Sequence, residues 1–182
     1  IFYTSLQSAP CFIEDKPVLI PLGVDQDPHF RLTRDIAPKI GKAKPALIHN
    51  IMIPGLEGPG GKMSASDENG TIYTTDSPNV VKKKINKYAF SGGQTSVEEH
   101  RKLGGNPDVD VSFQYLRIFF EQDDNKLKSI YEDYKSGKLL SGELKAILIE
   151  KINAFLLIHQ EKREKAKDQI EQFLFENKWK LS

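Results

Sequence analysis

The sequence has little of several features that would assign a protein to a class. It contains one cysteine, Cys11, in 182 residues, so no disulfide can close within the chain. Its 26 lysines and arginines nearly balance 25 aspartates and glutamates, and the net charge of +1 excludes a strong overall field for a polyanion. No apolar run approaches the roughly 18 residues that a membrane-spanning helix needs. We therefore expect a protein of a reducing, soluble compartment, in which any contact with nucleic acid depends on local groups of charge.

The amino terminus lacks the pattern of a targeting segment. Residues 1–12 read IFYTSLQSAPCF, without a basic flank, a continuous apolar stretch or a small-residue cleavage site. The first residue, Ile1, is not a methionine. We interpret these residues as an internal segment of a longer protein and expect the chain to be its C-terminal portion.

Short apolar runs alternate with glycine and proline up to about residue 75. The runs at 18–23 and 46–53 are typical of strands, and a helix is predicted between them at about 28–37. The helix has two candidate caps, Asp25 and Asp27. Its expected buried face consists of Phe30, Thr33, Ala37 and Ile40. Pro38 and Gly41 are expected to end it. This part predicts an α/β fold.

The spacing of apolar residues becomes helical after residue 76. Helices are predicted to begin after Asp76 or Ser77, after Ser96 in a capping box with Glu99, after Asp110 and after Ser141. A further helix is marked by Leu127, Ile130, Tyr131 and Tyr134 and ends at Gly137. The Asp110 helix is expected to reach Gln122, and the last helix to run through Phe173. This half predicts an all-α helical bundle.

The densest chemical signal is the segment Gly58 to Asp67, GPGGKMSASD. Glycines allow backbone N–H groups to approach an oxyanion, Lys62 supplies a mobile charge, and Ser64 and Ser66 supply hydroxyl donors. These groups suit phosphate oxygens, although Met63 after the lysine excludes a Walker P-loop. From the residues alone, a flexible surface linker is the alternative.

Within that segment, KMSAS at residues 62–66 resembles the KMSKS signature of class I aminoacyl-tRNA synthetases, in the form used by eukaryotic-type tryptophanyl-tRNA synthetases. The flanking blocks resemble the same family in the same order, and they cover nearly the whole chain. They are GVDQDP from Gly23, FRLTRDIAPKIG from Phe30, AFSGG from Ala89, EEHR from Glu98 and GGNPDVDVSFQYL from Gly104.

This resemblance implies a two-step ligase of protein synthesis. Tryptophan and ATP, with Mg²⁺, would give tryptophanyl-adenylate and pyrophosphate, and the tryptophanyl group would pass to tryptophan tRNA. Residues 1–75 would be the C-terminal half of a Rossmann-like catalytic domain, and residues 76–182 a helical anticodon-binding domain. The family further implies a cytoplasmic homodimer with no membrane partner.

The resemblance also implies roles for individual residues. Lys62, Ser64 and Ser66 would be catalytic, holding the outer phosphates and stabilising the charge that leaves with pyrophosphate. ATP would contact Gly23, Val24, Lys62, Met63, Ser64, Ala65 and Ser66. Ala65 stands where many class I enzymes have a second lysine. Gln7 and Gln26 would bind tryptophan, because an amide both donates and accepts in one plane.

Alternatives remain for several of these residues. Gln7 also fits a residue on the surface of a helix, and Asp25 fits either a helix cap or a ligand. The family places an anticodon contact at Lys145, and Lys82 and Lys83 belong to a basic cluster with Lys84 and Lys87 that suits tRNA phosphates or a solvated face. No metal-binding spacing occurs among the four histidines, so no structural metal is expected, and Cys11 is expected to be a small buried hydrophobe.

The second class I signature, an HxGH-type loop, does not occur in this sequence. We therefore expect the chain alone to be unable to form the adenylate. Two hypotheses follow. The chain is either part of an active tryptophan ligase, or a non-catalytic helical module for binding tRNA or protein that derives from one. The presence of both Gly23 to Gln26 and Lys62 to Ser66 favours the ligase.

Overall fold

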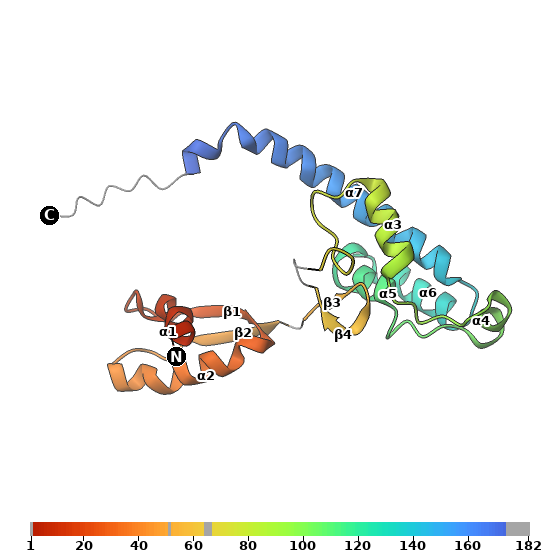
Figure 1. The fold of residues 1–182 in the computed structure, drawn as a ribbon. Helices are drawn as coiled ribbons and strands as arrows, with labels where there is room; N and C mark the ends of the chain where they lie inside the picture. The colour runs from red at the N-terminus through yellow and green to blue at the C-terminus, as the bar shows by residue number, and fades with distance from the viewer. Residues whose placement is uncertain (1, 51, 64–66, 174–182) are drawn as a thin grey trace. The chain divides into compact units, whose positions relative to one another are not determined.

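A computed structural model describes residues 2–50, 52–63 and 67–173. The chain divides into two compact units, Ile1–Ile53 and Pro54–Ser182, and each is described by itself (Figure 1). Seven α-helices and four β-strands occur in the described residues. None of those helices is long and apolar enough to cross a bilayer.

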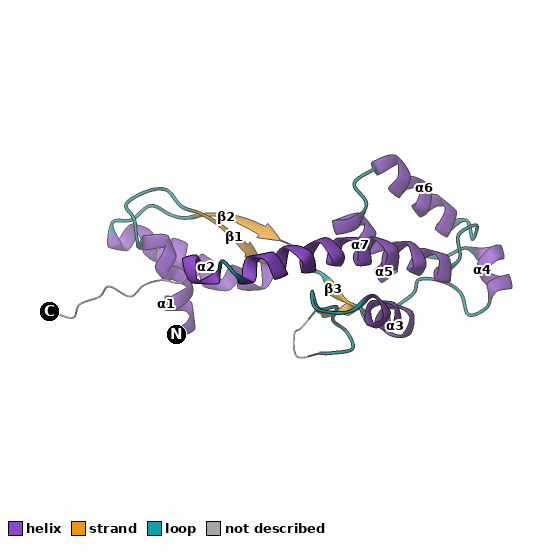
Figure 2. Ribbon diagram, turned by 90° about the horizontal axis from the view of Figure 1, so that it is seen from above, coloured by secondary structure: helices purple, strands orange, loops and turns teal. Residues whose placement is uncertain are grey.

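The first unit is a parallel pair of strands with two helices. Its strands are β1 (Leu19–Gly23) and β2 (Ala46–Asn50), paired from Leu19 with Ala46 to Gly23 with Asn50. Its helices are α1 (Phe2–Ser8) and α2 (Asp27–Ile36), with short 3₁₀ turns η1 (Ala9–Phe12), η2 (Val24–Gln26) and η3 (Ala37–Ile40). The helices contact each other beside the strands (Figures 1 and 2). Parallel pairing brings the carboxyl ends of both strands to one edge.

A small apolar core holds this unit together. Cys11, Leu22 and Phe30 are buried in one cluster, against which Phe12, Ile20 and Leu47 pack. The prediction that Cys11 is a buried hydrophobe is confirmed, since 4% of it is exposed. Burial raises the pKa of its thiol, because the charged thiolate loses hydration.

Helix α2 follows its predicted range closely, with two corrections. It stops before Pro38, and Gly41 closes η3 in the left-handed region at φ 70°, as expected. Its N-cap is Gln26, which makes no side-chain cap, so the prediction of an Asp25 or Asp27 cap is wrong. Ile40 is also wrong as a buried position, because it lies beyond the helix in η3 and is 52% exposed.

The second unit begins with an antiparallel hairpin and continues as helices. The hairpin strands are β3 (Pro54–Gly55) and β4 (Gly58–Lys62). The helices are α3 (Pro78–Tyr88), α4 (Val97–Leu103), α5 (Val111–Tyr115), α6 (Asp124–Lys135) and α7 (Ser141–Lys167), with a π-turn η4 (Leu116–Phe120) and a 3₁₀ turn η5 (Ile170–Phe173). Figure 2 shows α7 as the long helix of this unit.

Three of the predicted helix caps are confirmed. The Ser77 hydroxyl accepts a hydrogen bond from the Val80 N–H at 3.4 Å, and the Ser96 hydroxyl accepts one from the Glu99 N–H at 3.1 Å. The Asp110 carboxylate accepts from the N–H groups of Ser112 and Phe113. Each oxygen satisfies a backbone donor that the first turn leaves unpaired.

Two helix lengths differ from the prediction. The Asp110 helix leaves α-geometry at Leu116 for the π-turn, in which Phe119 is 47% exposed, and so does not continue as an α-helix to Gln122. The last helix stops at Lys167, before the 3₁₀ turn, rather than at Phe173. Its first residue is Ser141, and Glu143 rather than a hydroxyl caps the turn by accepting from the Leu140 N–H at 2.7 Å.

A buried polar network joins the helices of the second unit. Asp110 is 1% exposed and accepts from the Gly92 N–H at 2.9 Å and the Tyr134 hydroxyl at 2.8 Å. Tyr134 is fully buried and also hydrogen-bonds the hydroxyl of Ser141 at 3.0 Å. Burial raises the pKa of Tyr134 to about 12. Four residues of α7, spaced as one helical face, are buried in the same unit: Leu144, Leu148, Ile152 and Leu156.

Candidate functional site

The predicted nucleotide residues Gly23 and Val24 lie where β1 ends. Gly23 pairs with Asn50 at the shared carboxyl edge of the strands, and Val24 begins the 3₁₀ turn that leads into α2. A Cβ atom on Gly23 would lie 2.7 Å from a carboxylate oxygen of the exposed Asp25, which would have to move to admit it. In open α/β sheets, ligands bind beyond the carboxyl ends of the strands.

The two predicted tryptophan ligands are neighbours in space. The Gln7 side chain, on α1, donates from Nε2 to Oε1 of Gln26 at 3.3 Å, although 19 residues separate them. Gln7 also donates to the Tyr3 hydroxyl at 2.7 Å. Both glutamines are half-buried. The arrangement therefore presents two amide groups together near the carboxyl end of β1.

Tyr3 was not among the predicted site residues. It lies one helical turn before Gln7, and its ring meets the edge of the His29 ring at 5.2 Å between centroids. His29 in turn hydrogen-bonds the Thr4 hydroxyl through Nδ1 at 2.8 Å. The i, i+4 spacing of Tyr3 and Gln7 was the available signal, because such residues share a helix face.

Asp27 ties the start of α2 to the end of β2. Its carboxylate accepts from His49 Nε2 at 2.7 Å and from the Arg31 side chain. The hydrogen bond from His49, then those contributed by Arg31, hold the pKa of Asp27 below its usual value. Asp27 thus fixes the local backbone next to Gln26 instead of capping the helix.

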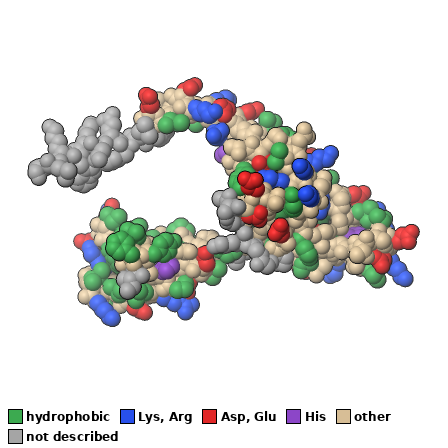
Figure 3. All heavy atoms as spheres, in the orientation of Figure 1, with side chains coloured by type: hydrophobic (Ala, Val, Ile, Leu, Met, Phe, Trp, Pro, Cys, Tyr) green, Lys and Arg blue, Asp and Glu red, His purple; other side chains and the backbone are tan. Residues whose placement is uncertain are grey.

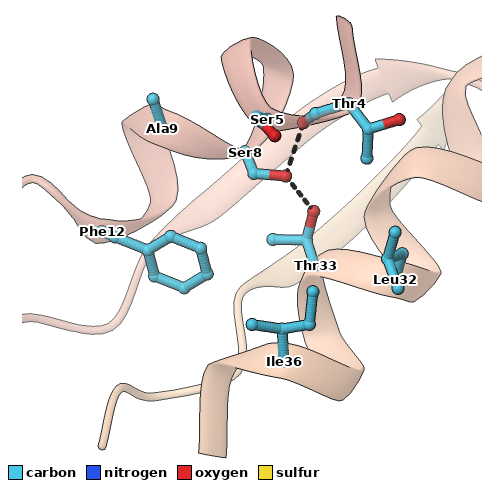
Figure 4. A pocket seen from close by; sticks show the side chains of 8 residues that line it. All are labelled: Thr4, Ser5, Ser8, Ala9, Phe12, Leu32, Thr33 and Ile36. Carbon is cyan, nitrogen blue, oxygen red and sulfur yellow. Dashed lines mark hydrogen bonds between the residues drawn. The ribbon is translucent and has the colours of Figure 1, made fainter. Parts of the chain in front are cut away.

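A cavity of about 480 Å³ lies between α1 and α2 (Figure 4). Two of its lining residues, Ser8 and Thr33, share a hydrogen bond of 2.5 Å between their hydroxyls. The lining residues are Thr4, Ser5, Ser8, Ala9, Phe12, Leu32, Thr33 and Ile36. None of the predicted ligand residues lines this cavity, so it is a separate feature of the unit.

Lys62, the predicted phosphate contact, is the last residue of β4. For Gly58 to Asp67 the residues alone left a flexible surface linker as the alternative, whereas Gly58–Lys62 is a strand whose Lys62 pairs with Pro54. Gly58 has φ 122°, a conformation that favours glycine. Met63 is half-buried, and Ser64, Ala65 and Ser66 lie outside the described residues.

The hairpin that bears Lys62 is fastened to the helices of its own unit. The buried Tyr115 hydroxyl donates to the Pro54 carbonyl at 2.7 Å. The Phe90 N–H donates to the Leu56 carbonyl at 2.7 Å, and the Leu56 N–H donates to the Gly70 carbonyl at 3.0 Å. Burial raises the pKa of Tyr115 well above its usual value, so its hydroxyl stays a donor at neutral pH.

The basic cluster on α3 does not act as one group. Lys and Arg side chains gather over α3 in the space-filling view (Figure 3), and Lys82, Lys83 and Lys87 are exposed. Lys84 points the other way and pairs with Asp76, so its prediction as part of a solvated or phosphate-facing run is wrong. The cause is the helical period, since Lys84 lies one turn from the buried Val81.

Lys145, the predicted anticodon contact, lies on α7 beside α3. Its Nζ donates to the Asn86 carbonyl at 3.4 Å, and partial burial lowers its pKa. Just after the AFSGG block, the Thr95 hydroxyl donates a hydrogen bond to the Glu99 carboxylate at 2.6 Å. Within the described residues, no group of three or more His, Cys, Asp or Glu is placed to hold a metal ion.

The sequence profile of the family described as class I tRNA synthetases (W and Y) matches residues 1–157. The chain belongs to this family. It therefore has strands and helices of the class I tRNA synthetase fold, in a mostly helical arrangement.

Individual relatives agree with the family match. The chain is 57% identical over 176 residues to the tryptophan–tRNA ligase of Sulfolobus acidocaldarius, which is 97% of this chain and 46% of that relative. It is 49% identical to the cytoplasmic tryptophan–tRNA ligase of Homo sapiens, covering 93% of this chain and 38% of that protein. The chain thus spans less than half the length of these relatives.

A solved structure extends the likeness to the fold. The tryptophanyl-tRNA synthetase of Encephalitozoon cuniculi bound to tryptophan aligns with a TM-score of 0.78 at 37% identity, over 97% of this chain and 49% of that chain. The class I fold is therefore shared along nearly all of this synthetase-family chain.

Proposed function

We propose that this chain is part of a tryptophan–tRNA ligase. The intact protein would convert tryptophan and ATP into tryptophanyl-adenylate and pyrophosphate, and then transfer the tryptophanyl group to tryptophan tRNA. The observation that carries the proposal is the Gln7–Gln26 amide pair at the carboxyl edge of the parallel strands. The relatives named tryptophan–tRNA ligase, at up to 57% identity, support the same activity.

We further propose two domains. Residues 1–75 would form the C-terminal half of a Rossmann-like catalytic domain, with parallel β1 and β2 as two of its strands. Residues 76–182 would form a helical-bundle domain of the anticodon-binding type, in which Lys145 contacts the anticodon and Lys82 and Lys83 contact tRNA phosphates. The exposure of Lys82 and Lys83 supports the last role.

Each substrate group has proposed partners in the chain. Gly23 and Val24 would approach the adenosine of ATP with their backbone, and the absence of a side chain on Gly23 supports that approach. Lys62 would hold the outer phosphates, with Met63, Ser64, Ala65 and Ser66 in the same ATP-binding segment. Mg²⁺ would enter bound to the phosphates of ATP, the form in which this ion commonly reaches nucleotide sites.

In the reaction, Lys62 would act by charge. As the bond to the pyrophosphate breaks, negative charge grows on the leaving oxygens, and an ammonium group placed there lowers the barrier. The serine hydroxyls of Ser64 and Ser66 would donate hydrogen bonds to the same phosphates. Gln7 and Gln26 would orient the amino acid, which converts binding into correct placement for attack.

The proposal includes a homodimer as the oligomeric state and the cytoplasm as the location. The relative named as cytoplasmic in Homo sapiens supports the location. The presence of both Gly23 to Gln26 and Lys62 to Ser66 supports the ligase over the alternative of a non-catalytic helical module.

Calorimetry of tryptophan binding to the intact protein tests this proposal. We expect tryptophan to bind and Gln26→Ala to weaken binding by roughly tenfold, because one hydrogen bond to a polar substrate group is lost. Gln122→Ala, an exposed glutamine after η4, is the matched control and should bind like the wild type. Undetectable tryptophan binding by the wild type would contradict the proposal, and unchanged binding by Gln26→Ala would remove Gln26 from the site.

A further inference from the structure

Lys84 makes an ion pair with Asp76 that is largely shielded from solvent. Its Nζ lies 2.7 Å from the Asp76 carboxylate, and the two side chains are 13% and 11% exposed. The same Nζ donates to the Thr71 carbonyl at 2.9 Å and lies 4.5 Å from the centroid of the Tyr73 ring. One ammonium group thus contacts three residues of the segment 71–76.

Such an arrangement is better suited to fixing geometry than to adding stability. Taking two charges out of water is costly, and a buried ion pair often returns little net stability. A lysine with a carboxylate, a carbonyl and a ring around it is, however, confined to one position. The exposed Lys82 and Lys83 on the same helix make no comparable set of contacts among the described residues.

The segment that Lys84 holds is joined to the hairpin that bears Lys62. Gly70, directly before Thr71, accepts from the Leu56 N–H at 3.0 Å, and Leu56 lies between strands β3 and β4. Lys62 is the last residue of β4. The chain before and the chain after the KMSAS segment are therefore linked to each other through Leu56 and Gly70.

A second side chain holds the same segment from α7. Gln160 donates from Nε2 to the carbonyls of Thr74 and Asp76, at 2.9 and 3.1 Å. This contact is independent of charge and spans 84 residues of sequence or more. Residues 71–76 are thus fastened by α3 through Lys84 and by α7 through Gln160.

We propose that Lys84 is a positioning residue for Lys62. It does not touch substrate; it fixes residues 71–76, and through Gly70 and Leu56 the hairpin, so that the Lys62 backbone is held where the ammonium group is needed as pyrophosphate leaves. This role rests on the proposed function of the chain as part of a tryptophan–tRNA ligase. It assigns to Lys84 a part in the rate of adenylate formation and none in tryptophan recognition.

The test compares four variants of the intact protein. Lys84→Met removes the charge with little change in shape, and Lys84→Arg keeps a cation that can reach Asp76. Gln160→Ala removes the second contact from a partly exposed position, where folding is not at stake. Lys162→Met, an exposed lysine of α7, is the matched control.

Tryptophan-dependent ATP–pyrophosphate exchange is measured per active site, with kcat and KM separated. Lys84→Met should lower kcat by roughly tenfold or more, because a small displacement of a catalytic group is costly, and should leave the KM for tryptophan unchanged. Lys84→Arg should restore most of kcat, Gln160→Ala should lower it by about two- to fivefold, and Lys162→Met should match the wild type. A merely structural role predicts unchanged kcat per active site in every variant, and that result would overturn the proposal.

Hydrogen exchange gives a readout that does not need activity. In Lys84→Met the amides of Leu56 and Tyr73 should exchange faster, because they donate to Gly70 and to Asp76. Unchanged exchange at both amides would show that Lys84 does not hold this segment. If the wild type shows no ATP–pyrophosphate exchange with any amino acid, the proposed function fails. Faster amide hydrogen exchange in Lys84→Met would then still show that Lys84 holds residues 71–76, but its assignment to adenylate formation would be overturned.

Discussion

Single residues decide the chemistry of this chain, and Lys62 is the one with the sharpest expected effect. In the intact protein, Lys62→Ala should lower the rate of adenylate formation by roughly 10²–10³, as for loss of one preorganised charged donor. Tryptophan affinity should change much less, since the charge on pyrophosphate develops only in the transition state. Single-turnover kinetics with tryptophan calorimetry checks both. A preserved rate with a collapsed tryptophan affinity would contradict the role.

Tyr134 predicts a loss of stability at high pH. Its folded pKa of about 12 exceeds the ordinary value of about 10, so the folded state holds this proton more tightly than the unfolded state does. Its contribution is complete below pH of about 10 and is lost as the pH rises towards about 12. The free energy of unfolding should fall by up to about 3 kcal/mol across that range.

Tyr134→Phe tests this dependence. The variant should be less stable at pH 7 by roughly 1–3 kcal/mol, because the buried Asp110 carboxylate loses a donor. Its stability should also fall less steeply between pH 10 and 12 than that of the wild type. Thermal unfolding followed across this pH range measures both, and an equal slope in the two proteins would show that Tyr134 is not the titrating group.

The residue types alone did not predict which of several identical side chains makes a specific contact. Lys82, Lys83 and Lys84 are adjacent and look equivalent in sequence, yet only Lys84 is directed towards Asp76. Gln7 and Gln26 were paired by resemblance to a family, and their contact at 3.3 Å is between segments that no local pattern connects. Contacts between distant residues depend on packing, which sequence periodicity does not encode.

Among the elements, those set by local chemistry were predicted well. The Ser77, Ser96 and Asp110 caps each require only an acceptor two or three residues before the donors, and all three form. The β3–β4 hairpin was missed because its strands consist largely of glycine and proline, which have poor strand propensity. It is held instead by Tyr115 and Phe90 from the helices.

The hairpin makes a prediction of its own. Gly58→Ala should destabilise the protein by roughly 1–3 kcal/mol, because its φ of 122° strains an alanine and the new Cβ would lie 3.3 Å from the Phe90 ring. Gly142→Ala on α7 is the control, since a Cβ there meets no atom within 4 Å. That control should stabilise by up to about 1 kcal/mol. Denaturant unfolding of both variants measures the difference, and an equal response would contradict the backbone argument.

At the scale of the whole molecule, the small net charge of +1 does not exclude binding of tRNA. Lys82, Lys83 and Lys87 are exposed on α3, and Lys145 lies beside that helix on α7; in the proposed function such local charges would contact phosphates. For binding of tRNA phosphates, the local distribution of charged side chains matters more than the net charge of the chain.

Activation of tryptophan by the intact protein is the property from which the other proposed roles follow. The most direct measurement is ATP–pyrophosphate exchange with each of the twenty amino acids in turn, with the 182-residue chain assayed in parallel. We predict exchange by the intact protein with tryptophan alone, and none by the isolated chain, whose sequence has no HxGH-type loop. Exchange that depends on tyrosine or another amino acid, or no exchange by the intact protein, would contradict the central claim.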